Sequence, residues 1–312
     1  MLAKRFLGYR LDPTAPTAGR LRVLILAVLV VLLVGCEPGD MLSRRSPGEP
    51  ASPSEQGTRT AERPGPHPKF DLSYDELEQM TAALPERIAE RILKEPAEFL
   101  EALKPVLAQP SELTRLVNKD VHLPDDYEPE DLVALDDYRH RFVLNRAGMK
   151  LSRRALDPLT EMVEAARRDG ITLDLSSVYR SIEYQRGLFA RYARVHGREE
   201  AERFSAEPGA SEHHLGTAID FGSIAPEFAE TAAGKWLREH AWRYGFSLSY
   251  PEDKEWLTGY IYEPWHYRYI GRPATELKRR FFVGIQHHLL VFLHAHRDEL
   301  EARRRVADSG DA

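Results

Sequence analysis

Apolar residues recur at helical spacing in three stretches between residues 73 and 107. Within each stretch, large apolar side chains lie three or four positions apart, as they do on the buried face of an amphipathic helix. They are Leu77, Met80, Leu84, Ile88, Ile92, Leu93, Phe99, Leu100, Leu103 and Leu107. Proline at positions 85, 96 and 110 separates the stretches, and proline is typical of helix starts and stops. The pattern predicts three short helices that form an appendage over residues 71–112.

The rest of the chain, over residues 113–312, mixes helical and strand patterns in no regular order. Helical periodicity covers residues 151–168, 182–196 and 236–244, and strand patterns cover residues 171–178, 246–250 and 260–269. The charged segment Pro273–Arg305 predicts one long C-terminal helix. Because helices and strands do not alternate regularly, we expect an α+β fold, with a small antiparallel sheet flanked by helices.

The N-terminus has the pattern of an export signal. Five basic residues precede Val23–Val34, an apolar run that is shorter than the roughly 20 residues of a membrane-spanning helix. The run ends in Leu33-Val34-Gly35-Cys36, which resembles the lipobox of bacterial lipoproteins and implies lipidation of Cys36. We therefore expect a lipoprotein signal peptide over residues 1–35. A plain signal peptide, with Cys36 incidental, is the alternative.

Residues 36–70 are rich in proline, glycine, serine and charge, and they predict a flexible tether. Together with the signal, this segment predicts an exported protein of the cell envelope that is anchored to a membrane by lipid. The lipid anchor is then the expected membrane contact.

Charge and cysteine content narrow the chemistry that is available to the chain. The formal net charge of the 312 residues is −6, which gives no basic footprint for nucleic acid. The single cysteine excludes an intramolecular disulfide and any site built from several cysteines. A metal would therefore have to be bound by histidine, aspartate or glutamate.

Two short segments concentrate such ligands. Ser211–Asp220 reads SEHHLGTAID, and Glu263–His266 reads EPWH. Three nitrogen or oxygen ligands with a fourth position left for water form a catalytic zinc site. A carboxylate beside such a site can move protons between water and a leaving group.

The order and spacing of these motifs resemble the zinc D,D-carboxypeptidases of the VanY type and their L,D-carboxypeptidase relatives. The likeness spans about residues 116–271 and includes the SVYRS stretch at residues 177–181, where valine replaces the usual glycine. The resemblance implies a Hedgehog/DD-peptidase-like fold. It also implies that His213, Asp220 and His266 bind Zn²⁺ and that Glu263 is the general base.

Three further residues take roles by the same resemblance. Arg180 would stabilise the developing oxyanion or bind a substrate carboxylate, whereas Gln185 and Ser211 would line the pocket for the terminal residue. Strand parity alone would select His214 rather than His213 as the partner of Asp220, because residues an even number apart share a face. The family spacing selects His213, and Gly216 would permit the necessary bend.

The resemblance implies a hydrolase that removes C-terminal D-alanine from peptidoglycan stem peptides, and we expect it to act as a monomer. An L,D-carboxypeptidase or a cell-wall endopeptidase would carry the same zinc pattern. Two alternatives without catalysis are a wall-binding lipoprotein and a structural lipoprotein without metal. The histidines of the C-terminal segment predict packing or solvated positions rather than a second metal site; they are His287, His288, His294 and His296.

Overall fold

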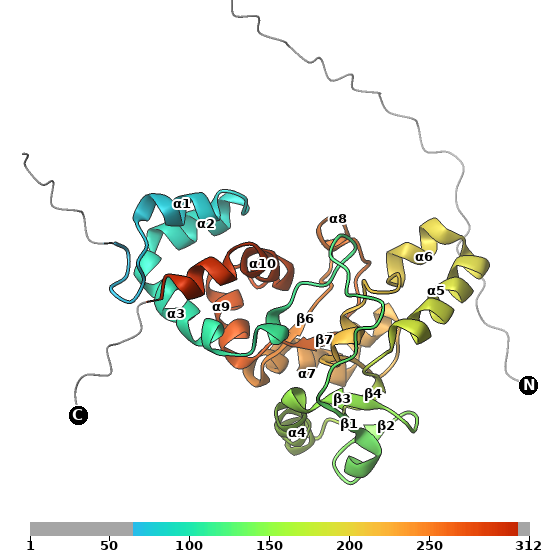
Figure 1. Ribbon diagram of the computed structural model, residues 1–312. Coiled ribbons are helices and arrows are strands. Elements are labelled where there is room, and N and C mark those ends of the chain that lie inside the picture. Colours follow the sequence, from blue (N-terminus) through green and yellow to red (C-terminus); the bar gives the residue numbers. More distant parts are fainter. Residues whose placement is uncertain (1–64, 305–312) are drawn as a thin grey trace, which may run out of the picture. The chain divides into compact units, whose positions relative to one another are not determined.

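The computed structural model describes residues 65–304 (Figure 1). The expected signal peptide, Cys36 and most of the expected tether lie outside the described residues. The end of that tether is not a free segment as expected, because His67 and Phe70 are 8% and 1% exposed. Phe70 also pairs with Arg304 in an isolated β-bridge. The packed part of the chain therefore begins before residue 71.

A five-stranded sheet forms the centre of the fold, in the strand order β2-β4-β5-β7-β6. The strands are β2 (Val143–Leu144), β4 (Asp174–Ser177), β5 (Ala218–Phe221), β6 (Phe246–Leu248) and β7 (His266–Tyr269). A separate antiparallel pair joins β1 (Leu132–Ala134) to β3 (Lys150–Ser152). The α+β class is confirmed. The expectation of an antiparallel sheet was wrong at one edge, where the two-residue β2 runs parallel to β4.

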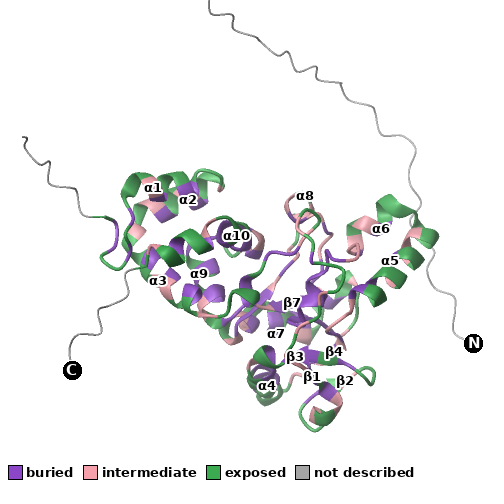
Figure 2. Cartoon of the chain, in the orientation of Figure 1, coloured by how far each residue is buried: buried purple, intermediate pink, exposed green. Residues whose placement is uncertain are grey.

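Helices of this half pack on the sheet or extend from it. They are α4 (Arg153–Arg168), α5 (Ile182–His196), α6 (Arg198–Phe204), α7 (Ala232–His240) and α8 (Glu255–Thr258). The expected apolar stripe of α4 is buried in a core with the sheet residues Leu175, Ile219 and Phe221. Figure 2 shows this purple inner layer along β7 and α4.

Five short 3₁₀ turns complete this part of the chain. They are η1 (Ser111–Thr114), η2 (Leu135–Tyr138), η3 (Glu212–Leu215), η4 (Pro226–Glu230) and η5 (Ala241–Tyr244). None of the helices within residues 65–304 is both long and apolar enough to cross a membrane.

The three expected N-terminal helices are α1 (Tyr74–Thr81), α2 (Glu86–Lys94) and α3 (Pro96–Ala108). They share one hydrophobic core with α9 (Arg272–Phe281) and α10 (Gln286–Ala302). The ring of Phe99 on α3 contacts the rings of Phe281, Phe282 and Phe292. The expected boundary at residues 112–113 therefore does not separate two cores.

The expected single C-terminal helix was also wrong, because the chain breaks between α9 and α10. Val283 and Gly284 have φ values of 46° and 78°, in the left-handed region that ends a helix. A glycine supplies this conformation readily, whereas a β-branched valine adopts it at a cost. The break turns α10 back so that it can pack on α3 and α9.

Buried charge joins the helical layers. Arg297 of α10 is 8% exposed and donates hydrogen bonds to the carbonyls of Leu107 and Gln109, at 3.1 and 2.8 Å. These carbonyls lie at the C-terminal end of α3, where a helix leaves acceptors unpaired and favours a cation. Arg297 thus ties α10 to the end of α3.

Lys278 of α9 is the contrasting case, because this buried amine bonds a hydroxyl group rather than a carboxylate. Its Nζ donates to Ser247 Oγ at 2.7 Å, and burial lowers the pKa of the lysine to about 8. Because the unfolded chain holds this proton more tightly, stability should rise as pH increases from about 8 towards 10.5.

We therefore expect Lys278→Met to raise the free energy of unfolding at pH 7 by about 2–3 kcal/mol, since the burial penalty is about 3 kcal/mol and the lost hydrogen bond offsets about 1. Denaturant titrations at pH 7 and pH 9.5 measure it. The gain should shrink at the higher pH. An equal gain at both values would mean that the amine is not a buried cation.

Candidate metal centre

Three side chains from three segments meet beside the β5–β7 pair, in the interior of the central sheet. Asp220 of β5 lies directly opposite His266 of β7 in the antiparallel register. Residues directly opposite each other in such a pair project to the same face of the sheet. The third side chain, His213, comes from η3 immediately before β5. The pairing of β5 with β7 therefore brings together residues that are 46 positions apart in sequence.

His213 reaches Asp220 because the chain between them is not a straight strand. η3 ends at Gly216, whose φ of 67° is left-handed. A side chain at Gly216 would also collide with Leu132, because a Cβ there would lie 2.9 Å from its Cδ2. The turn changes the direction of the chain, so strand parity does not apply between residues 213 and 220.

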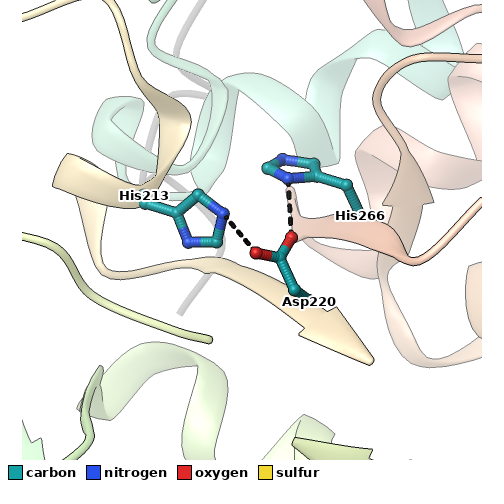
Figure 3. Close-up of side chains that lie close together, drawn as sticks. All are labelled: His213, Asp220 and His266. Atoms are coloured by element: carbon teal, nitrogen blue, oxygen red, sulfur yellow. Dashed lines mark hydrogen bonds and ion pairs between the residues drawn. The ribbon is translucent and has the colours of Figure 1, made fainter. Parts of the chain in front are cut away.

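The two histidines contact opposite oxygens of the same carboxylate (Figure 3). His213 Nε2 lies 3.1 Å from Asp220 Oδ2, and His266 Nδ1 lies 3.0 Å from Asp220 Oδ1. All three residues are at most 4% exposed, and one ligand atom from each lies within 4.8 Å of the others. A cation could contact all three groups at once.

The outer nitrogen of each ring fixes which atom faces inward. His213 Nδ1 lies 2.6 Å from the carbonyl oxygen of Val178, which can only accept, so Nδ1 carries the proton. His266 Nε2 lies 3.1 Å from Glu212 Oε2. The nitrogens left for a metal are therefore Nε2 of His213 and Nδ1 of His266. Such outer partners are typical of metal-binding histidines.

The donor set fits zinc. Buried His213 Nε2 makes no hydrogen bond of acceptable geometry, although Asp220 is close. Two imidazole nitrogens and one carboxylate, with room for a water, are ligands that catalytic zinc takes. A metal bound to His213 Nε2 would give this buried nitrogen the partner that it lacks.

His214 lies outside this cluster. Its Nδ1 lies 2.7 Å from the carbonyl oxygen of Arg180, and its Nε2 accepts a hydrogen bond from the Gly209 N–H at 3.2 Å. Both ring nitrogens are thus occupied by backbone groups. The geometry favours His213 over His214, as the family spacing does and strand parity does not.

Glu263 and Arg180 lie next to different members of the cluster. Glu263 Oε2 lies 3.7 Å from His266 Nδ1, and Arg180 Nη2 lies 3.9 Å from Asp220 Oδ2. Glu263 precedes β7, and its N–H donates to the Tyr250 carbonyl. Arg180 also lines a cavity of about 340 Å³, together with Lys150 and Tyr179. Both side chains are therefore close enough to act on a molecule bound at the metal.

Burial controls the protonation of these groups. Burial raises the pKa of Glu263 to about 8. Burial, with help from Arg180, lowers the pKa of His213 to about 4. For His266, burial works in the opposite direction to its hydrogen bonds with Asp220 and Glu212, and these bonds prevail and raise its pKa. A carboxyl with a pKa near neutrality can both accept and donate a proton.

Gln185 and Ser211 each make hydrogen bonds within the protein. Gln185 is fully buried, and its Nε2 donates to the Ala206 carbonyl at 2.7 Å and to Ser205 Oγ at 3.3 Å. Ser211 Oγ accepts from the backbone N–H of His213 at 3.3 Å. Ser205 lines a cavity of about 190 Å³, together with Tyr260 and Lys119. The substrate-binding roles of Gln185 and Ser211 stay predictions.

The motifs gave no role to two residues that contact His266. Glu212 bonds its outer nitrogen, and the ring of Tyr250 packs 4.9 Å from its ring centroid. A carboxylate next to a ligand histidine in the SEHH stretch was the one available signal. The sequence could not show that Glu212 contacts His266 rather than the neighbouring His213.

Comparison with known proteins places this site in a family. The family model described as "VanY: D-alanyl-D-alanine carboxypeptidase" matches residues 148–272. The chain is 37% identical over 177 residues to YodJ of Bacillus subtilis (strain 168), a span that covers 55% of this chain and only 64% of YodJ.

A second curated relative is matched over most of its length. It is the bifunctional D-Ala-D-Ala dipeptidase and D-Ala-D-Ala carboxypeptidase VanXYC of Enterococcus gallinarum, which is 34% identical over 173 residues, covering 52% of this chain and 86% of the relative. Among solved structures, the LdcB LD-carboxypeptidase matches with a TM-score of 0.53 and 34% identity, covering 59% of this chain and 88% of that chain. These matches confirm the resemblance seen in the motifs.

The geometry predicts different outcomes for the two neighbouring histidines. We expect His213→Ala to abolish binding of a stoichiometric zinc ion, because one of three ligands is lost. His214→Ala should still bind one zinc ion, although the melting temperature should fall as two buried hydrogen bonds are lost. Metal analysis after dialysis, together with thermal melts, separates the two effects. Zinc retained by His213→Ala and lost by His214→Ala would reverse the assignment.

Proposed function

Because this chain belongs to the VanY D-alanyl-D-alanine carboxypeptidase family, we propose that it is a zinc-dependent carboxypeptidase. Its substrate would be a peptidoglycan stem peptide, from which it would remove the C-terminal D-alanine. The observation that carries the proposal is the buried convergence of His213, Asp220 and His266, with Glu263 within 3.7 Å of a ligand ring. The chain spans less than two thirds of the length of its relative YodJ.

Zinc held by these three residues would polarise the scissile carbonyl and lower the pKa of a bound water to about 7. Glu263 would take the proton of the attacking water. Because its pKa lies near neutrality, the same carboxyl can then deliver that proton to the leaving amine.

Arg180 supplies positive charge on the other side of the cluster. Its guanidinium lies close to Asp220, and its side chain is 18% exposed, so it can face a bound substrate. A preorganised cation of this kind stabilises an oxyanion that develops on the carbonyl. The same position would also suit a substrate carboxylate, and Arg180 is proposed to serve one of these two roles.

Two peptide bonds of the stem peptide are candidates for cleavage. We favour the bond between two D-alanines, since the family model and VanXYC carry that name. Cleavage between an L-centre and D-alanine is the second candidate, because the LdcB LD-carboxypeptidase shares the fold at 34% identity. Pocket shape rather than the zinc ligands would decide between them. Digestion of stem pentapeptides and tetrapeptides, followed by mass analysis, distinguishes the two.

We expect Glu263→Gln to keep zinc but lose about 10²–10⁴-fold in kcat on the pentapeptide, because the proton carrier is gone while the ligands remain. Glu183→Gln, a change on an exposed side chain of α5, is the matched control and should retain full activity. Unchanged turnover by Glu263→Gln would remove this residue from the mechanism. A wild-type protein that is zinc-loaded but inactive on both peptides would favour a non-catalytic wall-binding protein.

We also propose that the protein acts outside the cytoplasm, where peptidoglycan lies, and that lipid on Cys36 tethers it to a membrane. The support is the lipobox-like sequence at residues 33–36, which follows a short apolar run.

The lipid anchor predicts that Cys36→Ser, expressed from the full chain, will move from the membrane fraction to the soluble fraction. Ser43→Ala is a nearby control that should remain with membranes. Fractionation followed by immunoblotting measures the distribution. Continued membrane retention of Cys36→Ser would contradict lipidation at this site.

A further inference from the structure

We propose that Glu212 is a positioning residue for His266 and that helical segments outside the family-matched region hold it in place. The inference rests on the proposed metal site. It adds a role for the flanking segments, namely η1 with the residue after it and the first turn of α10. These segments would set the affinity for zinc without contacting the ion.

One carboxylate oxygen of Glu212, Oε2, fixes the orientation of the His266 ring. It is 4% exposed, and its Oε2 accepts from His266 Nε2 at 3.1 Å and from Ser249 Oγ at 2.6 Å. A carboxylate cannot donate when it is ionised, so His266 must carry its proton on Nε2. With its proton on Nε2, the neutral ring would offer the lone pair of Nδ1 to a metal.

Arg268 balances the charge of Glu212. It is fully buried on β7, two residues after His266, and therefore projects to the same side of the strand. Its Nη1 donates to Glu212 Oε1 at 2.9 Å. Its Nη2 donates to the carbonyls of Leu113 and Arg115, at 3.2 and 2.7 Å. The N-terminal flank thus fixes the guanidinium that holds Glu212.

Gln286 holds Glu212 from the C-terminal flank. It is the first residue of α10, is 2% exposed, and donates from Nε2 to Glu212 Oε1 at 2.9 Å and to Ser249 Oγ at 3.0 Å. α10 is tied to α3 through Arg297. Residues 113, 115 and 286 all lie outside the family-matched range of 148–272.

Both carboxylate oxygens of Glu212 accept hydrogen bonds only from buried partners in these contacts. The partners are His266, Ser249, Arg268 and Gln286. The carboxylate therefore has one orientation, and so has the ring that it bonds. Removing an outer partner of a metal ligand typically weakens metal binding by about 10–100-fold. Loosening Glu212 from the flank should lower zinc affinity even when all three proposed ligands remain.

The decisive variant is Gln286→Met, which keeps the length of the side chain and removes its two donated hydrogen bonds. We expect zinc to bind about tenfold more weakly in competition with a chromophoric chelator. The visible spectrum of the Co²⁺-loaded protein should also change, because the orientation of His266 sets the ligand field. Lys278→Met is the matched control, since it removes an equally buried polar group that bonds Ser247 instead. Its zinc affinity and Co²⁺ spectrum should equal those of the wild type.

A folded Gln286→Met protein with wild-type zinc affinity and an unchanged Co²⁺ spectrum would overturn the inference. Glu212→Gln gives an independent reading, with an expected loss of about 10–100-fold in zinc affinity. If it fails to fold because Arg268 is left unpaired, Gln286→Met still decides the question. A wild-type protein that binds no zinc would refute the proposed function instead.

Discussion

The register between β5 and β7 is the constraint on which the rest of the site depends. It sets Asp220 opposite His266, and the turn that ends at Gly216 then brings His213 to the remaining carboxylate oxygen. A slip of one residue would send Asp220 to the other face of the sheet. The buried apolar positions of β5 on both sides of Asp220 resist such a slip, because they would also have to change faces.

Placing this much charge inside a protein is costly unless every group has a partner. In this structure the partners form successive shells around the three proposed ligands. Backbone carbonyls and Glu212 take the outer nitrogens of the rings, and Arg268 neutralises Glu212. The outermost layer comes from helices that the family match does not cover. The candidate metal centre that the core motifs define is thus held in part by segments outside the family match.

Sequence patterns predicted the two long helices α4 and α5 well. α5 matches its expected bounds, and α4 differs only where residues 151 and 152 join β3. The short strands β1, β2 and β3 were missed because segments of two or three residues give no periodicity. The C-terminal helix was predicted as continuous because no proline marks the break at Val283 and Gly284.

The convergence of His213, Asp220 and His266 was predictable because two motifs carry all three residues in a recognisable order. The layer behind them was not. Glu212 meets its partners at sequence separations of 37, 56 and 74 residues, and no local pattern encodes such pairings. The choice between His213 and His214 likewise needed the turn, because the strand rule assumes an extended chain.

The most direct test of the account is to locate the metal itself. Crystals of the zinc-loaded protein, measured above and below the zinc absorption edge, should give one strong anomalous peak per chain. The peak should lie about 2.0–2.2 Å from His213 Nε2, His266 Nδ1 and an Asp220 oxygen. A peak on His214 or on the histidines of α10, or no peak at all, would contradict the central claim.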